Sequence, residues 1–322
     1  MFGEHTMKRI ILCIVITLSV VASAPARTTE LTLHAPKAFE ATKKYILLPQ
    51  ADQQSDTDAA ALYEKAVQSL PGNIAMEDIQ GWLKTPSEKL PQEKVQSTLQ
   101  QFEPMLKLLE QAATCKKCEW PYLDDDTLMK NLRNYRNILF LLALKVRYQI
   151  AQGQYDEALS STRTGFAMAK HLGQDTALVR NLFGISVAAY MCRQLEAFIQ
   201  RPDAPNLYEA LRGLPQPVID LTKRVQWEDS DIKRKVHSLM NRLDRHVATL
   251  QCIEAMRLYA ATHEGRFPKQ LSDITQVPVP DDPVTHKPFI YSRTGAEAVL
   301  EGPAPEGAQA REAIRYELHL KE

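Results

Sequence analysis

The sequence lacks a net charge of either sign. Its 322 residues include 39 Lys and Arg against 39 Asp and Glu, and the charges are interspersed without a long block of one sign. A neutral chain has no sequence-independent attraction for nucleic acid or for an anionic membrane surface. The charge balance therefore argues against a nucleic-acid partner.

The sequence also lacks the short motifs that mark common catalytic sites. It contains no nucleophile elbow, phosphate-binding loop or metalloprotease motif. His237, His246 and His263 are not spaced as metal ligands. The acidic run Asp124–Asp126 is more typical of a helix cap than of a cation site. We expect no catalytic, metal or cofactor site, and whether the protein is an enzyme stays open, with the balance against it.

Cysteine is scarce, with five residues, and one pair of cysteines is close in the sequence. Cys115 and Cys118 form the motif CKKC in a helical, proline-broken region. A redox-active CxxC usually opens a helix after a strand, and a zinc site needs two further ligands, for which no second CxxC or HxxxH is present. We expect a local structural disulfide between Cys115 and Cys118, or two unpaired thiols, ahead of a redox or metal site.

The longest apolar run lies near the beginning of the sequence. The basic stretch Met7–Arg9 precedes the run Ile10–Ala24, and Ala26 offers a cleavage position for signal peptidase. This is the pattern of a secretory signal peptide, and the run is short for a membrane span. We predict a signal peptide at residues 1–26 and an exported protein, in the periplasm or cell envelope. The alternative is an uncleaved membrane anchor formed by residues 8–24.

The rest of the chain divides into a polar segment, a long helical part and a short end. Residues 27–56 are polar and contain two prolines, so we predict an extended linker. Residues 57–245 show apolar residues at helical spacing, and we predict a helical domain. The clearest predicted helices span residues 59–72, 128–153, 154–173 and 175–200. Asp175 is the expected cap of the last of them.

Residues 246–322 change character after Gly265. Prolines become frequent, and the segments FIYSR and EAVLEG are typical of strands. The final segment AIRYELHL alternates apolar and polar residues, as a half-buried strand does. We predict a small α+β domain of one helix and about three antiparallel strands. Asp282-Pro283 and Pro288 are expected to set the turn that leads into the sheet.

Two segments resemble helices of tetratricopeptide repeats. GQYDEAL has Gly153, Tyr155 and Ala158 at signature positions of that family, and LYEKAVQSLP has Tyr63 and Ala66. A regular array needs at least about three units at a spacing of about 34 residues, and these two lie about 90 residues apart. The resemblance implies an irregular body of helix hairpins, with a concave face for a protein or peptide partner.

The carboxyl-terminal third is similar to the soluble part of type II secretion major pseudopilins. The matching positions are Tyr259, Phe267-Pro268, Asp282-Pro283 and Pro288-Phe289. The turn is one residue longer than in that family, no aromatic residue follows Pro283, and the long prepilin helix with its processing site is absent. The resemblance implies a local fold. Neither pilus assembly nor the family's calcium-binding acids are carried over.

Most of residues 57–318 also resembles a group of uncharacterised secreted proteins from planctomycete-type bacteria. The segments APNLYEALRGLPQPVIDL and YDEALSSTRTGFAMAKHLG are among those that carry the resemblance. The group implies no activity to transfer. Its members have glycine where this chain has His286, which implies a backbone φ above zero at this residue.

Three hypotheses about function follow from these observations. The first is an exported helical scaffold without enzymatic activity that binds a protein or peptide. The second is an exported enzyme of unrecognised type, with its site between the helical body and the sheet. The third is an accessory component of a pseudopilin-linked secretion or envelope assembly. A scaffold predicts a groove without convergent titratable groups, whereas an enzyme predicts a deep pocket with perturbed carboxylates or histidines.

Overall fold

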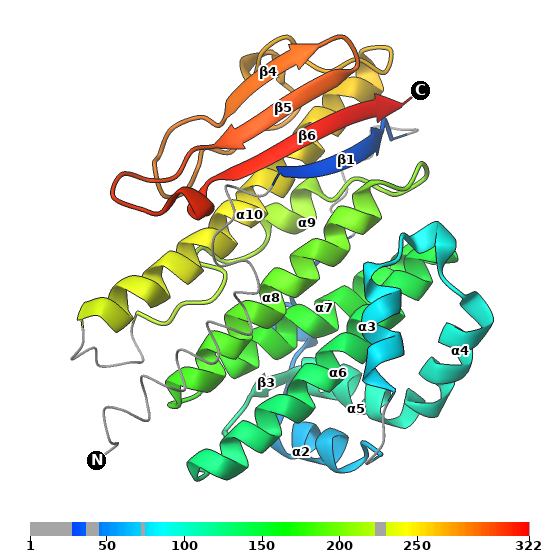
Figure 1. Cartoon of the computed structure of the whole chain (residues 1–322), viewed down its shortest axis with the longest axis vertical. Coiled ribbons are helices and arrows are strands. Elements are labelled where there is room, and N and C mark those ends of the chain that lie inside the picture. The colour runs from blue at the N-terminus through cyan, green and yellow to red at the C-terminus, as the bar shows by residue number, and fades with distance from the viewer. Residues whose placement is uncertain (1–27, 37–44, 72–74, 223–229, 322) are drawn as a thin grey trace.

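The structure, a computed structural model, describes residues 28–36, 45–71, 75–222 and 230–321. It is a mostly helical protein with a sheet built mainly from the carboxyl-terminal part of the chain (Figure 1). The predicted fold class is confirmed at this level. The predicted signal peptide, residues 1–26, lies outside the described residues.

The helices begin short and become long toward the middle of the chain. The first four are α2 (Ala60–Gln68), α3 (Met76–Lys84), α4 (Gln92–Gln101) and α5 (Glu103–Ala113). The long helices that follow are α6 (Asp125–Ala151), α7 (Tyr155–Leu172) and α8 (Leu178–Ile199). A one-turn helix α9 (Tyr208–Arg212) then precedes the longest helix, α10 (Ser230–Thr262). Within the described ranges there are also four 3-10 turns: Ala51–Gln53, Ser87–Lys89, Leu271–Asp273 and Ala310–Glu312.

The starts of two long helices test the predicted caps. Asp124 caps α6 as expected, because its carboxylate accepts a hydrogen bond from the N–H of Thr127 at 3.0 Å. Asp175 does not cap α8, which begins after Ala177. The buried guanidinium of Arg180 pairs with the Asp175 carboxylate instead. Pairing with a buried charge has taken the place of the predicted cap.

Helix α8 is the central helix of the bundle. Among the residues that the structure describes, it is the one helix long and apolar enough to cross a membrane by length and composition, and 61% of its apolar window is buried. It packs against α6, α7 and α10. Gly184 permits the close approach to α7, since a Cβ there would lie 2.7 Å from the carbonyl oxygen of Ala169. These contacts identify α8 as a buried core helix.

The main sheet has four strands in the order β1-β6-β5-β4. Strands β4 (Ile290–Thr294), β5 (Glu297–Gly302) and β6 (Ile314–Lys321) are antiparallel neighbours, as predicted. The predicted alternation of β6 is confirmed, because Tyr316, Leu318 and Leu320 are buried. A second, two-stranded parallel sheet joins β2 (Ser55–Asp58) to β3 (Cys115–Lys117).

The fourth strand corrects the predicted linker. Strand β1 (Thr28–His34) lies in the segment 27–56 and pairs in parallel with β6, with Leu31 beside Leu318 and Leu33 beside Leu320. Both leucines of β1 are buried. The extended shape was predicted, but its pairing partner lies almost 290 positions away in the sequence and left no local signal.

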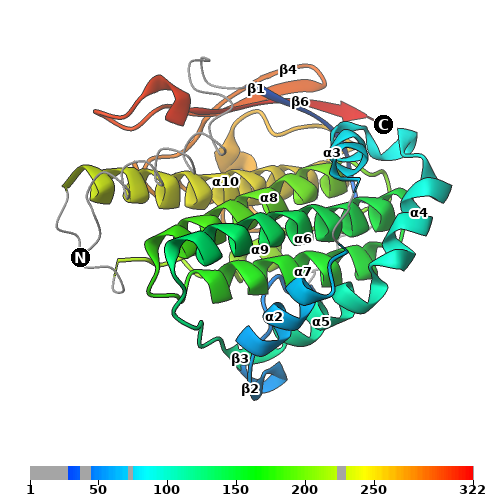
Figure 2. The ribbon, with the colours of Figure 1, turned by 60° about the horizontal axis from the view of Figure 1, so that its bottom comes forward.

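Helix α10 lies between the sheet and the other helices (Figure 2). The predicted domain boundary between residues 245 and 246 falls inside this helix, which continues without a break. Its residues from Val247 to Met256 are buried almost throughout. The sheet and the other helices form two layers that share α10 (Figure 2). Helix α10 therefore positions the surfaces at which the two layers meet.

The contact at Gly184 gives a stability prediction. Gly184→Ala should destabilise the protein by about 1–3 kcal/mol, because the new methyl group would meet backbone atoms that cannot turn aside. The matched control is Gly81→Ala in α3, where nothing lies within 4 Å of an added Cβ. This exposed change should stabilise by about 0.5–1 kcal/mol. Urea unfolding measures both, and equal effects would contradict the packing of α7 on α8.

Candidate functional site

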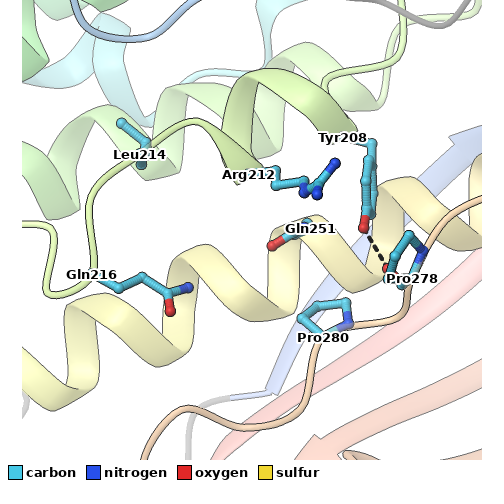
Figure 3. Close-up of a pocket in the computed structure, with 7 residues that line it drawn as sticks. All are labelled: Tyr208, Arg212, Leu214, Gln216, Gln251, Pro278 and Pro280. Carbon is cyan, nitrogen blue, oxygen red and sulfur yellow. Dashed lines mark hydrogen bonds between the residues drawn. The ribbon is translucent and has the colours of Figure 1, made fainter.

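A pocket opens where α9, α10 and a proline-rich segment meet (Figure 3). Its volume is about 450 Å³, within the range of ligand sites. The residues that line it are Tyr208, Arg212, Leu214, Gln216, Gln251, Pro278 and Pro280. The pocket lies at the seam between the helical body and the segment that leads into the sheet. It thus combines residues that lie up to 72 positions apart in the sequence.

A buried polar network fixes α9, which carries Tyr208 and Arg212. The side chain of Asn206 accepts a hydrogen bond from the N–H of Tyr208 at 2.9 Å and donates to the carbonyl oxygen of Glu254 at 2.9 Å. Glu254 and Arg257 are fully buried and pair at 2.9 Å. Burial raises the pKa of Glu254, while the charge of Arg257 acts in the opposite direction. This network attaches the short helix to α10.

Tyr208 connects α9 to the opposite wall of the pocket. Its hydroxyl group donates a hydrogen bond to the carbonyl oxygen of Pro278, as the dashed line in Figure 3 shows. Burial raises the pKa of Tyr208, and a hydrogen bond with Gln251 opposes this effect. The phenol therefore stays protonated at neutral pH. It acts as a fixed donor that holds the proline segment in place.

A second contact with α10 positions the loop that carries Gln216. The carboxylate of Asp244 accepts a hydrogen bond from the backbone N–H of Val218 at 2.8 Å. Burial raises the pKa of Asp244 to about 6, and the hydrogen bond from Val218 acts in the opposite direction. Gln216 is exposed at the mouth of the pocket. Helix α10 thus holds this loop as well as α9.

The proline segment is held beyond the pocket by a buried ion pair. Nε of Arg245 donates to Oδ2 of Asp282 at 2.9 Å, and both side chains are 2% exposed. Arg245 also donates to the carbonyl oxygens of Glu312 and Pro303. Gly302 leaves room for this arrangement, because a Cβ there would lie 2.7 Å from Nη2 of Arg245. One guanidinium therefore joins α10 to three separate backbone segments.

The turn after this ion pair confirms the predicted role of Asp282. Its Oδ1 accepts a hydrogen bond from the N–H of Val284 at 3.0 Å, and its backbone pairs with Lys287 and His286. His286 has a φ of 54°, which confirms the predicted positive φ. Asp282 satisfies the turn and Arg245 together. The segment is a structural turn that fixes the pocket wall.

The pocket presents hydrogen-bonding groups but no carboxylate or imidazole among the described residues that line it. Two glutamine amides can each donate and accept, and Arg212 offers a guanidinium that is 58% exposed. Arg212 is paired with Glu209 of its own helix at 3.4 Å, a weak surface contact. Such a set binds polar and anionic groups, and it lacks an acid–base pair for proton transfer.

The most strongly perturbed histidine lies elsewhere. His171 is buried between α2 and β3, with Nε2 3.0 Å from the carbonyl oxygen of Cys115 and Nδ1 2.9 Å from the hydroxyl of Tyr63. A carbonyl only accepts, so Nε2 carries the hydrogen and Nδ1 accepts from Tyr63. Burial lowers the pKa of His171 to about 4. This neutral histidine joins three elements of the helical body.

The predicted cysteine site lies in the same part of the molecule. Cys115 and Cys118 are both buried and both are free thiols in the structure. Sγ of Cys115 lies 3.3 Å from Oγ1 of Thr57. Burial raises the pKa of Cys118 far above its usual value, which disfavours the reactive thiolate. The expectation of a local disulfide or of two unpaired thiols at Cys115 and Cys118 stays a prediction.

Comparisons with known proteins leave the site to be interpreted from its chemistry. No protein-family model, curated protein or solved structure matches this chain. The resemblances to tetratricopeptide repeats, to pseudopilins and to secreted bacterial proteins therefore stay predictions.

Sequence reasoning did not assign the residues of this pocket. The segment APNLYEALRGLPQP and the proline cluster indicated only turns and boundaries between elements. Gln251 lies in the middle of a long helix and carried no signal. The spacing of apolar residues identifies the buried face of a helix or strand. The pocket depends instead on how three elements cross in the folded protein.

The buried ion pair yields a second prediction. Asp282→Ala should destabilise the protein by about 3–5 kcal/mol, because it leaves the Arg245 guanidinium buried without its counter-charge. The neighbouring exposed residue provides the control: Asp281→Ala should change stability by less than about 0.5 kcal/mol. Guanidinium chloride unfolding distinguishes the two. A mild effect of Asp282→Ala would show that the ion pair does not hold the turn.

Asp244 yields a prediction of pH dependence. Its pKa is higher in the folded state than the usual value of an aspartate, so the protonated form favours folding. This contribution is present at low pH and is lost as the pH rises from about 4 to about 6. Asp244→Asn keeps an acceptor for Val218 and removes the charge. The variant should match the wild type near about pH 4 and exceed its stability by about 1–2 kcal/mol near about pH 7.5.

Urea unfolding at the two pH values measures this difference. Asp281→Asn, an exposed substitution, controls for the general effect of removing one negative charge. The difference in unfolding free energy between Asp244→Asn and the wild type should depend on pH. An equal difference at both pH values would show that the pKa of Asp244 is not raised.

Proposed function

We propose that the protein is an exported interaction protein without enzymatic activity, which binds an extended peptide segment of a partner protein in the pocket between α9, α10 and the Pro278–Pro280 segment. The observation that carries this proposal is the lining of the pocket. It combines two prolines, a tyrosine and a leucine with two amides and one exposed guanidinium. This is a surface for recognition rather than for proton transfer.

The chemistry of the lining suits a peptide. Peptide groups carry one donor and one acceptor per residue, and the amides of Gln216 and Gln251 offer both kinds of partner. The flat surfaces of Pro278 and Pro280 accept an apolar side chain without loss of conformational freedom. Arg212 is available for a carboxylate, because its contact with Glu209 is long and exposed. The expected ligand is therefore an extended segment with one acidic and one apolar residue.

The walls of the pocket are held in place before any ligand arrives. Tyr208 and Asp244 attach the proline segment and the Gln216 loop to neighbouring elements, and Arg245 fixes the chain beyond Pro280. A preformed site loses little conformational freedom on binding, which favours affinity for a short segment. A volume of about 450 Å³ accommodates a few side chains rather than a folded domain.

The scaffold around the pocket is consistent with irregular tetratricopeptide-like hairpins. Helices α6, α7 and α8 follow one another and pack as consecutive neighbours. We propose that the helical body consists of such hairpins and that the chain is exported. Export is supported by the basic and apolar pattern of residues 7–24, with an uncleaved anchor at residues 8–24 as the alternative.

Selection from a phage-displayed library of linear random peptides tests the proposed site. The bait is the chain from residue 27 onward, and recovered peptides are then measured by fluorescence anisotropy. Enriched peptides should carry an acidic residue near an apolar one. Arg212→Ala should weaken their binding by about tenfold, because one charge-assisted contact is lost.

The control is Arg234→Ala on α10. Arg234 is also exposed and also pairs with an acid three residues away, but it does not line the pocket. Its substitution should leave peptide binding unchanged. Failure to enrich any peptide, or equal effects of the two arginine substitutions, would count against the pocket as a peptide site.

A further inference from the structure

Three arginines that lie far apart in the sequence come together on another side of α10. They are Arg193 on α8, Arg242 on α10 and Arg311 in the short turn Ala310–Glu312. All three side chains are exposed. They belong to both layers of the molecule, so their proximity depends on the tertiary structure.

Hydrogen bonds between neighbouring residues establish this convergence. Glu196 accepts a hydrogen bond from Nε2 of His246 at 2.8 Å, which joins α8 to α10. Arg193 lies three residues before Glu196, and Arg242 lies four residues before His246. Residues at these spacings share one face of a helix, so the two arginines face each other beside this contact.

The third arginine is placed by the ion pair described above. The guanidinium of Arg245 donates to the carbonyl oxygen of Glu312, the residue after Arg311. Arg311 therefore lies over the turn of α10 that carries Arg242. The charges of Arg193 and Arg311 lower the pKa of Arg242, after burial as the largest cause, while Glu312 opposes them. The charges of Arg193 and Arg311 therefore act on the Arg242 guanidinium, which places the three side chains in one region of the surface.

None of the three guanidiniums has an ion pair or hydrogen bond with another described residue. Other arginines of the chain differ, since Arg180, Arg245 and Arg257 each pair with a buried carboxylate. The nearest carboxylate on α8, Glu196, already accepts hydrogen bonds from His246 and from Tyr316. Three positive charges therefore gather here without an ion pair among the described residues, although Glu196 and Glu312 act on them electrostatically.

We infer that Arg193, Arg242 and Arg311 form a binding site for a tetrahedral oxyanion, a phosphate group in particular. Each guanidinium offers several N–H donors in one plane, and one of them is enough to hold a carboxylate. Three guanidinium groups that come from different elements match the several oxygens of a phosphate better than the two oxygens of a carboxylate. Lys235 lies two turns before Arg242 on the same face of α10 and adds positive charge along the approach.

This site is separate from the peptide pocket. Asp244 and Gln251 are seven residues apart on α10 and face the pocket side. Arg242 precedes Asp244 by two residues, which places it on a different face of the helix. Phosphate binding therefore does not depend on the proposed peptide ligand, and the failure of one proposal leaves the other intact.

Isothermal titration calorimetry with inorganic phosphate tests the site on the chain from residue 27 onward. Ionic strength is held constant with sodium chloride. We expect saturable binding with one phosphate per chain. Arg242→Gln and Arg311→Gln should each weaken it by at least about tenfold, because each removes a charge-assisted contact from an exposed position.

Arg234→Gln is the matched control, because Arg234 is an exposed arginine on the same helix that is paired with Asp231. It should leave phosphate binding unchanged. Absence of saturable binding, or equal weakening by Arg234→Gln and Arg242→Gln, would overturn the inference. Circular dichroism melts of all variants verify that the fold is retained, so that lost binding reports on the site.

A second arm distinguishes a free phosphate from a lipid headgroup. Vesicles of phosphatidylcholine with and without phosphatidic acid are sedimented with the wild type and with Arg242→Gln. Binding to the phosphatidic acid vesicles that Arg242→Gln abolishes would assign the headgroup as a source of the phosphate. Vesicle binding that is unchanged by Arg242→Gln would show that the lipid headgroup does not use this site.

Discussion

A buried guanidinium is stable only when its N–H groups have hydrogen-bond acceptors. The acceptors of Arg245 come from three parts of the chain. Arg245 pairs with Asp282 and donates to the carbonyl oxygens of Pro303 and Glu312. Each acceptor lies in a segment that precedes a strand or links two of them. Because an unsatisfied buried charge is costly, these segments can occupy only one position relative to α10. The sheet, the pocket wall and the position of Arg311 all depend on this constraint.

A second buried pair acts in the same way further along α10. Glu254 and Arg257 are fully buried. The Glu254 carboxylate also accepts a hydrogen bond from Asn206, and Arg257 donates to the carbonyl oxygens of Ala204 and His34. A buried ion pair adds little net stability compared with apolar packing, but it accepts few alternative arrangements. Here it determines where α9 and β1 join the long helix. Helix α10 is thus the common support of both layers.

The two proposed sites occupy different faces of this support. The pocket has amides, prolines and an arginine with a weak partner. The arginine cluster has exposed guanidiniums without an ion pair to a described residue. Buried polar contacts position the elements that carry both proposed sites. Two strongly shifted titratable groups, His171 and Cys118, lie in the helical body and contribute to its packing. Both groups lie away from the two proposed sites.

The sequence by itself determined the long helices, strand β6 and the cap at Asp124, because each depends on residues within a few positions. The positive φ at His286 was implied by the resemblance to proteins with glycine at this position. Tertiary structure decided the rest. Strand β1 pairs with a strand from the other end of the chain. Asp175 forms an ion pair with Arg180 instead of the predicted helix cap. The pocket and the arginine cluster combine α8, α9, α10 and later loops, whose crossing is set by Arg245 and Arg257. Local patterns record which face of a helix is buried, whereas only packing decides which exposed residues meet.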